Sequence, residues 1–128
     1  MDYWCSIQHN DGSFDEFYPN ERGWVGPTAF TTYSIIESYT ILHKAIPEDT
    51  SKRIKKAIEK AAYFIAKGDL EEDHLANHHA MACLAVWKAY RLFEDDNLLI
   101  RFILFCNFQR CYNENPSFDG FFVYGHLG

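Results

Sequence analysis

The alternation of apolar and polar positions predicts a chain of helices separated by turn-rich loops. In residues 50–67 apolar side chains recur at i, i+3 and i+4 between charged ones, which predicts an amphipathic helix with one inward face. Residues 27–45 and 75–93 are apolar around most of the helix, as is typical of buried helices. Residues 97–112 are apolar on more than one face, and a short helix fits 1–9. The pattern predicts an all-α fold.

Turn-forming residues mark where these helices begin and end. Pro27 stands where the first residue of a helix is expected, because proline is tolerated in the first turn. Asp49 or Thr50 is expected to cap the next helix, since its side-chain oxygen can accept a hydrogen bond from a free backbone N–H. Gly12 and Gly68 follow helical segments and are expected to end them.

The order of apolar and polar positions in the helices recurs along the chain, which indicates an internal repeat. Shifted by 51 residues, the apolar positions of 27–45 fall on those of 75–93, and Glu37 falls on Lys88. The helices that follow align at a slightly different shift. Each unit is a buried helix, a short link and an outer helix, so the repeat predicts antiparallel α/α hairpins.

All the long loops fall on one rim, which we define as the N-terminal ends of the helices 27–45 and 75–93 with the loops beside them. Free backbone N–H groups converge at such ends, so a function is expected there. The polar and aromatic residues of these segments provide candidates for proton transfer and for stacking on a ligand. The candidate catalytic residues are Glu16, Asn77, His78, His79 and Tyr124. The candidate substrate-binding residues are Tyr18, Glu21, Arg22, Trp24, Asp119 and His126.

Each of these residues also has a simpler structural interpretation. A histidine at a helix start often bonds a neighbouring loop, and His78 and His79 point about 100° apart on a helix. Loop carboxylates are often ordinary surface charges, and loop aromatics often pin the loop. His74 and His78 lie on one helical face, as metal ligands do, but no HExxH motif or cysteine pair accompanies them. No metal site and no cofactor is predicted, because phosphate loops and dinucleotide fingerprints are absent from the sequence.

Length and charge limit the classes of function. The 128 residues are enough for a single domain, 1–128. A net charge of -6 argues against a nucleic-acid partner. The basic residues of 50–67 most simply form the solvated face of their helix, with a phosphate or anionic-lipid patch as the alternative. The four cysteines lack a CxxC pair and are expected to be reduced. Without a signal peptide or a membrane-spanning run, a cytoplasmic protein is expected.

The segment from Ile7 to Phe14, IQHNDGSF, resembles the Q-x-x-D-G-x-W/F turn of the α/α-toroid superfamily. This superfamily contains the six-hairpin barrels of glycosidases and polysaccharide lyases, and related terpenoid-cyclase and prenyltransferase-like repeats. The resemblance implies that the inner-helix rim lines a substrate cavity. It also implies that Asn, His and Tyr neutralise a uronate carboxyl and move its α-proton. Asn77, His78 or His79, and Tyr124 are the positions that match.

Two hairpins and a partial third cannot close a ring of five or six. We therefore expect a fragment, a minimal open stack or one part of an oligomer. The leading hypothesis is a carbohydrate-active domain, lyase-like or glycoside-hydrolase-like if enzymatic, that cleaves or binds acidic oligosaccharides. One alternative is a non-enzymatic repeat module that binds another copy or a partner, with 97–112 at the contact. Another is a terpenoid-cyclase-like module, although no DxDD-type motif is present.

Overall fold

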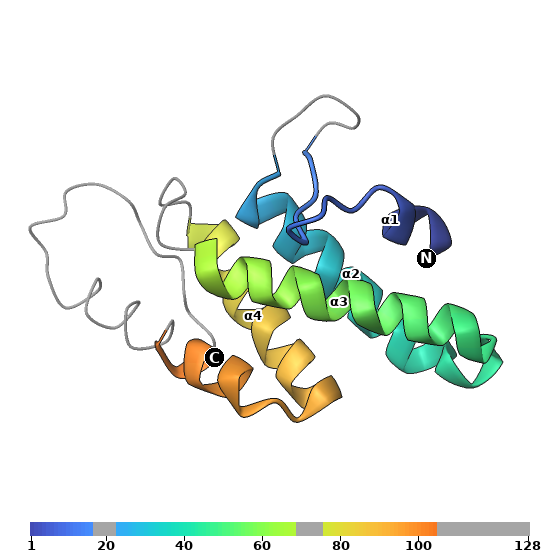
Figure 1. The fold of residues 1–128 in the computed structure, drawn as a ribbon. Coiled ribbons are helices and arrows are strands. Elements are labelled where there is room, and N and C mark those ends of the chain that lie inside the picture. The colour runs from blue at the N-terminus through green and yellow to red at the C-terminus, as the bar shows by residue number, and fades with distance from the viewer. Residues whose placement is uncertain (17–22, 69–75, 105–128) are drawn as a thin grey trace, which may run out of the picture.

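The computed structural model describes residues 1–16, 23–68 and 76–104, and these residues form helices that pack around one core (Figure 1). The elements are α1 (Asp2–Ser6), α2 (Val25–Leu42), the 3-10 helix η1 (His43–Ala45), α3 (Glu48–Gly68) and α4 (Ala76–Phe93). Residues 96–104 are also helical. Within the described ranges the only β-type pairing is an isolated bridge between Phe14 and Trp24. The predicted all-α fold is confirmed.

The helix α3 packs against the other numbered α-helices. It contacts α1, α2 and α4, and α2 in turn packs along α4. Figure 1 shows α2 and α4 running in the same general direction while α3 runs back against them. The link from α2 to α3 is short, through η1 and Pro47. The first two long helices therefore form the antiparallel hairpin that the sequence predicted.

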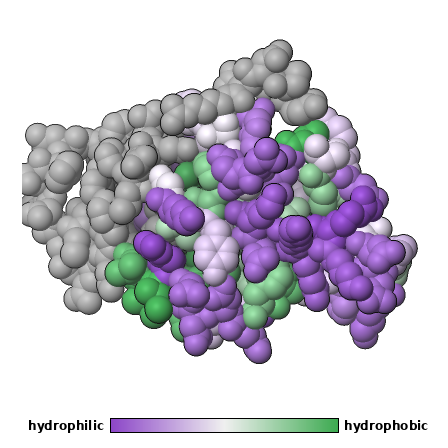
Figure 2. Space-filling view, viewed as in Figure 1, coloured by the Kyte–Doolittle hydropathy of each residue, from purple (hydrophilic) through white to green (hydrophobic). Residues whose placement is uncertain are grey.

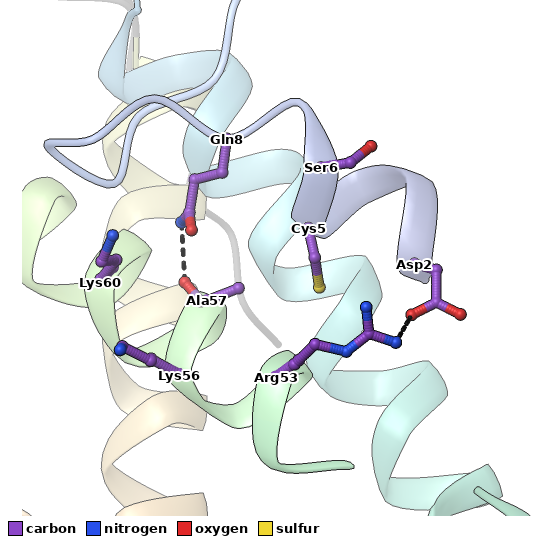
Figure 3. A pocket seen from close by; sticks show the side chains of 8 residues that line it. All are labelled: Asp2, Cys5, Ser6, Gln8, Arg53, Lys56, Ala57 and Lys60. Carbon is purple, nitrogen blue, oxygen red and sulfur yellow. Dashed lines mark hydrogen bonds and ion pairs between the residues drawn. The ribbon is translucent and has the colours of Figure 1, made fainter. Parts of the chain in front are cut away.

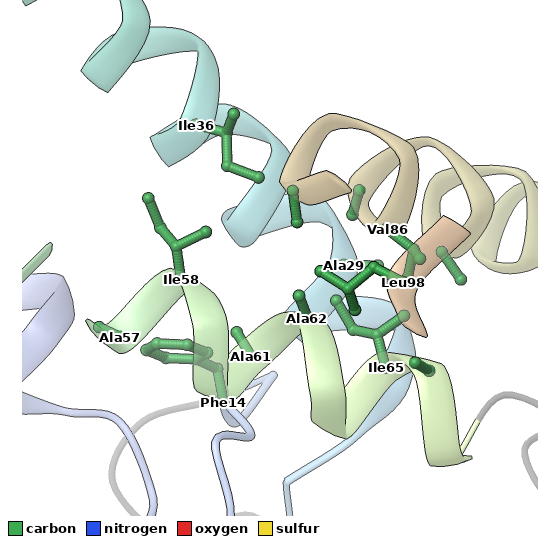
Figure 4. Close-up of a cluster of buried hydrophobic side chains, with 14 of the residues drawn as sticks. Phe14, Ala29, Ile36, Ala57, Ile58, Ala61, Ala62, Ile65, Val86 and Leu98 are labelled. Carbon is green, nitrogen blue, oxygen red and sulfur yellow. The ribbon is translucent and has the colours of Figure 1, made fainter. Parts of the chain in front are cut away.

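The inward face of α3 supplies the centre of the core. Every apolar position predicted from its periodicity is buried at 5% exposure or less: Ile54, Ala57, Ile58, Ala61, Ala62 and Ile65. Figure 4 shows Ile58 and Ile65 of α3 pointing toward α2 and α4, with Phe14 beside α3. Alanine at alternate contacts lets the neighbouring backbones approach closely. The opposite face of α3 is hydrophilic, as Figure 2 shows.

The prediction that α2 is buried over most of its surface is wrong for one face. The helix begins at Val25, two residues before the predicted start, and Phe30, Ile41 and Leu42 are 39%, 78% and 48% exposed. Its buried side is built instead largely from small or medium residues: Val25, Gly26, Thr28, Ala29, Thr32, Ile36 and Tyr39. A neighbouring helix can approach more closely on the face that carries small side chains. The larger apolar residues of α2 therefore remain on the exposed face.

The same division holds for α4. Its fully buried residues are Ala82, Ala85, Val86 and Ala89. Trp87 and Tyr90, which the sequence predicted as core, are only partly buried. The Trp87 ring lies 4.9 Å from the ring of Phe102 and beneath the guanidinium of Arg91, at 5.8 Å. Trp87 thus closes the edge of the core rather than filling its centre.

Asp95 joins the end of α4 to the helix 96–104 and to α3. Its carboxylate accepts hydrogen bonds from the Asn97 backbone N–H, at 3.0 Å, and from the Tyr63 hydroxyl. The bond from Tyr63 lowers the pKa of Asp95 below its usual value, and the same bond raises the pKa of Tyr63. The predicted helix 97–112 is seen only to residue 104, and its remainder lies outside the described residues.

Two further predictions concern the cysteines and the absence of a membrane-spanning helix. Cys5 and Cys83 are free thiols, while Cys106 and Cys111 lie outside the described residues. Among the described helices, none is long and apolar enough to cross a membrane.

Replacing Ile58 by alanine is expected to lower the free energy of unfolding by about 2 to 5 kcal/mol, because it leaves a cavity in the core. Ile58 is 0% exposed, whereas Ile41 is 78% exposed and provides the matched control. Ile41→Ala is expected to change the free energy by less than about 0.5 kcal/mol. Chemical denaturation of both variants measures the difference. Equal effects of the two substitutions would contradict this position of the core.

Candidate functional site

The turn between α1 and α2 is fixed on α3 by Gln8 and Gly12. The Gln8 side-chain amide donates hydrogen bonds to the backbone oxygen of Ala57 on α3, at 2.8 Å, and to that of Gly12, at 3.0 Å. Gly12 has φ of +98°, and a Cβ atom there would lie 2.3 Å from the Lys60 backbone oxygen. Only glycine combines this conformation with this close approach. Two residues of the Q-x-x-D-G-x-F motif therefore attach the turn to α3.

The other residues of the motif shape the turn itself. The Asp11 carboxylate accepts hydrogen bonds from the backbone N–H and the hydroxyl of Ser13, at 3.0 and 2.7 Å. Burial opposes ionisation of Asp11, but these bonds outweigh it and lower its pKa. Phe14 is 2% exposed and stacks on Trp4, with ring centroids 4.4 Å apart. The motif is thus a structural device that carries the chain from α1 to α2.

Phe14 also sets the position at which α2 begins. Its backbone N–H donates to the Thr28 hydroxyl at 2.9 Å, and its backbone oxygen accepts from the Trp24 N–H at 3.1 Å. The Thr28 hydroxyl donates in turn to the Trp24 backbone oxygen. Trp24, a predicted sugar-stacking residue, is half-buried and takes part in this loop contact.

A histidine and a carboxylate, which the sequence analysis missed, meet across the turn. His9 Nε2 lies 2.6 Å from Asp15 Oδ1, with the His9 side chain 42% exposed and the Asp15 side chain 3% exposed. A buried carboxylate behind an imidazole fixes the ring and its tautomer, an arrangement suited to proton transfer. The signal in the sequence is the turn Asp11-Gly12, which has His9 on one side and Asp15 on the other.

His78 lies against the first turn of α2. A Cβ atom on Gly26 would be 2.4 Å from His78 Nδ1, so the ring can occupy this place only because residue 26 is glycine. The ring also meets Phe30 edge to face, with centroids 5.9 Å apart. His78 is half-buried. The N-terminal ends of α2 and α4 are therefore in direct contact.

The two histidines lie at neighbouring points of the same helix end. A Cβ atom on Gly23, just before α2, would be 3.3 Å from His9 Cδ2 and 1.9 Å from the Ser13 hydroxyl oxygen. His9 therefore packs at residue 23 and His78 at residue 26, three positions apart at the start of α2. Two imidazoles, one of them held by a buried carboxylate, therefore lie near the beginning of α2.

The remaining predicted site residues are distributed unevenly. His79 Nε2 lies 3.6 Å from the Cys83 sulfur, one turn along α4, while Asn77 and Glu16 are exposed. The predicted site residues that lie outside the described residues are Tyr18, Glu21, Arg22, Asp119, Tyr124 and His126. His74, considered as a metal ligand, also lies outside them. The described ranges contain no group of three or more His, Cys, Asp or Glu residues arranged to hold a metal ion.

An ion pair connects the open faces of α2 and α4 below this end. Lys88 Nζ lies 2.7 Å from Glu37 Oε1, with the two side chains 35% and 40% exposed. The hydrogen bond to Glu37 raises the pKa of Lys88 above its usual value. Glu37 and Lys88 are the two charged residues that the predicted repeat aligns with each other. Their contact brings these two aligned positions of α2 and α4 side by side.

The sequence matches a protein family over most of its length. A profile described as the ulvan lyase N-terminal domain matches residues 1–114. The chain belongs to the ulvan lyase N-terminal domain family. No curated protein and no solved structure gave a match.

The matched range includes the turn between α1 and α2 and the beginnings of both α2 and α4. His9, Asp15 and His78 therefore lie within the matched range. The predicted site residues Asp119 and Tyr124 lie beyond it. Membership of the family agrees with the polysaccharide-related function that the resemblance implied.

The contact between Gly26 and His78 can be tested by a double-mutant cycle. Gly26→Ala is expected to lower the free energy of unfolding by about 1 to 3 kcal/mol, because the new methyl group overlaps the His78 ring. In a His78→Ala background the same change is expected to be neutral or stabilising, since alanine favours a helix. Chemical denaturation of the four proteins measures the coupling. An equal cost in both backgrounds would contradict the contact.

Proposed function

We propose that this domain binds an acidic oligosaccharide at the rim formed by the beginnings of α2 and α4, as part of a polysaccharide lyase. The observation that carries the proposal is the placement of His9 against Gly23, just before α2, and of His78 against Gly26 in the first turn of α2. The family match supports the proposed class of substrate, because the family is named for a polysaccharide lyase. Free backbone N–H groups at a helix N-terminus favour an anionic group of the ligand.

In this proposal the histidines move the protons of an elimination. One imidazole takes the proton from the carbon next to the uronate carboxyl, and the glycosidic oxygen leaves as the carbon–oxygen bond breaks. A carbon–carbon double bond forms, and the leaving oxygen takes up a proton from the second group. His9 is the better-oriented base, because the Asp15 carboxylate holds its ring. His78 then serves as the second proton-transfer group or as a contact to the carboxyl.

Other residues complete the proposed site. Asn77, exposed at the start of α4, can donate its amide to the uronate carboxyl. We retain the following residues as proposed catalytic or substrate contacts: Glu16, His79, Tyr124, Tyr18, Glu21, Arg22, Trp24, Asp119 and His126.

The proposed architecture is an open portion of an α/α toroid. In it, α2 and α4 are inner helices, while α1, α3 and the helix 96–104 form the outer layer. Two observations support this assignment: α1 contacts α3, and the Glu37–Lys88 ion pair joins α2 and α4 at equivalent positions. The ligand would then face the side of α2 that carries Phe30 and Glu37.

Cleavage and binding of ulvan oligosaccharides by the full chain and its variants test the function. His9→Gln and His78→Gln are each expected to lower kcat/KM by about 100-fold or more, because general acid–base groups contribute about that much. The appearance of unsaturated uronate ends, followed by ultraviolet absorbance, measures cleavage. Isothermal titration calorimetry measures binding.

His43→Gln is the matched control, because His43 is exposed at the opposite end of α2. Loss of cleavage with retained binding assigns His9 and His78 to proton transfer. Weaker binding in these variants alone assigns them to ligand contact at the rim. Cleavage and binding that are both the same in all three variants as in the unsubstituted chain, or both absent from the unsubstituted chain, would refute the proposed site.

A second candidate function is self-association. Three neighbouring apolar residues of the helix 96–104 are exposed: Ile100 at 55%, Ile103 at 48% and Leu104 at 52%. Figure 2 shows hydrophobic surface at the lower left, where this helix lies. An apolar face of this kind is typical of a contact with another protein surface. The family match gives no support to the terpenoid-cyclase-like alternative.

Light scattering after size exclusion measures the mass of the chain in solution and so tests self-association. If the apolar face joins two copies, the chain is expected to elute as a dimer or larger ring, and Ile103→Glu is expected to convert it to a monomer. Ile41→Glu, at an exposed position on α2, is the control and should leave the mass unchanged. A monomer at all concentrations would exclude self-association as the function of this face.

A further inference from the structure

A pocket away from the histidines lies between α1, the turn and α3. It has a volume of about 250 Å³ and is lined by Asp2, Cys5, Ser6, Gln8, Arg53, Lys56, Ala57 and Lys60 (Figure 3). Typical small-molecule sites measure about 300 to 1,000 Å³. The pocket therefore fits a small group, such as one sugar unit, rather than a larger ligand.

The lining of this pocket is positively charged in a chain that carries a net charge of -6. Arg53, Lys56 and Lys60 contribute three cations, and Asp2 contributes the only carboxylate of the lining. Arg53 pairs with Asp2 at 2.8 Å, whereas Lys56 and Lys60 have no ion-pair partner among the described residues. Two ammonium groups are thus available to an anion.

Arg53 keeps further donors. Its Nη2 donates to Asp2 Oδ1 at 2.8 Å and to the Thr50 hydroxyl at 3.3 Å. A guanidinium has five N–H donors, so its other nitrogen atoms remain available. Figure 3 shows the guanidinium beneath Cys5, on the side of the pocket that faces α1. An anionic group bound here would meet charge from two neighbouring turns of α3.

Gln8 adds a fixed acceptor. Both N–H bonds of its amide are used, to the backbone oxygens of Ala57 and Gly12 at 2.8 and 3.0 Å. The orientation of the amide is therefore set, and its oxygen atom remains free to accept a hydrogen bond. A hydroxyl group can donate to this oxygen. A fixed neutral acceptor beside several cations matches a sugar that carries both hydroxyl groups and an anionic substituent.

We propose that this pocket is a second binding site for one anionic sugar unit of a polysaccharide. The negative substituent lies against Lys56, Lys60 and the free donors of Arg53, and a ring hydroxyl donates to the side-chain oxygen of Gln8. The substituent is a carboxylate or a sulfate ester, which present the same charge chemistry. The identity of the ligand as a polysaccharide rests on the proposed function.

The pocket and the rim share one turn. Gln8 reaches toward α3 and lines the pocket, whereas the next residue, His9, meets Asp15 and packs at Gly23. The proposed second site therefore lies beside the His9–Asp15 pair. A polysaccharide held in the pocket would keep its neighbouring units close to the rim, which raises their effective concentration there.

Calorimetric titration of the full chain with three probes tests the second site. Oligogalacturonate carries carboxylates only, short dextran sulfate carries sulfate esters only, and dextran is neutral. The double variant Lys56→Gln/Lys60→Gln is expected to bind the preferred anionic probe about five- to tenfold more weakly, since each exposed ion pair contributes modestly. Comparison of the two anionic probes identifies the substituent, and dextran is expected not to bind measurably.

The matched control is Lys44→Gln/Lys52→Gln, which removes the same charge from exposed positions outside the pocket. Equal weakening in both double variants would mean that overall charge drives binding, and would overturn the proposal. Unchanged binding by Lys56→Gln/Lys60→Gln, or no binding of either anionic probe, would also overturn it. Thermal unfolding verifies that both variants remain folded, as expected for glutamine at exposed helical positions.

The two proposals fail in different ways. If only the histidine variants change the handling of ulvan oligosaccharides, the rim is retained and the pocket is rejected. If Lys56→Gln/Lys60→Gln weakens binding while His9→Gln and His78→Gln change neither cleavage nor binding, the pocket is retained and the rim is rejected.

Discussion

The approach of one turn to the backbone of α3 determines the rest of the candidate site. Gly12 permits this approach, because any side chain would overlap the Lys60 carbonyl, and Gln8 fixes it through two hydrogen bonds. With the turn in place, Phe14 enters the core, and the chain leaves in the direction that starts α2. The same turn brings His9 to Asp15. A single close contact thus positions the core aromatic, the beginning of a helix and the histidine pair.

Small residues have a comparable role between the long helices. Alanine, glycine and threonine face inward on α2 and α4, so the backbones lie close and the bulky residues remain on the open sides. At the rim, this close packing depends on one particular residue. Gly26 leaves room for the His78 ring, which could not otherwise reach the start of α2. The packing that stabilises the fold therefore also decides which histidine meets which helix end.

Periodicity in the sequence could predict some of these features and not others. The inward face of α3 was predicted residue by residue, because one apolar stripe on a charged helix leaves a single choice. On α2 the pattern misled, since Phe30 and Ile41 are apolar but the small residues pack. The pair of His9 and Asp15 was missed because a turn, not a period, brings the two together. Contacts across turns require backbone geometry that a one-dimensional pattern does not contain.

The distribution of charge over the chain affects where an anionic ligand makes its first contact. A chain with a net charge of -6 repels an acidic polysaccharide at long range, and at physiological ionic strength this repulsion is screened beyond about 8 Å. Half of the twelve lysines and arginines lie on α3, so its outer face is where an anionic chain meets the least repulsion. Gln8, which lines the pocket together with Lys56 and Lys60 of α3, lies on the turn that ends beside the start of α2. In the proposed function, a polyanion that first contacts the lysines and arginines of α3 is led from there along the turn toward His9 and His78.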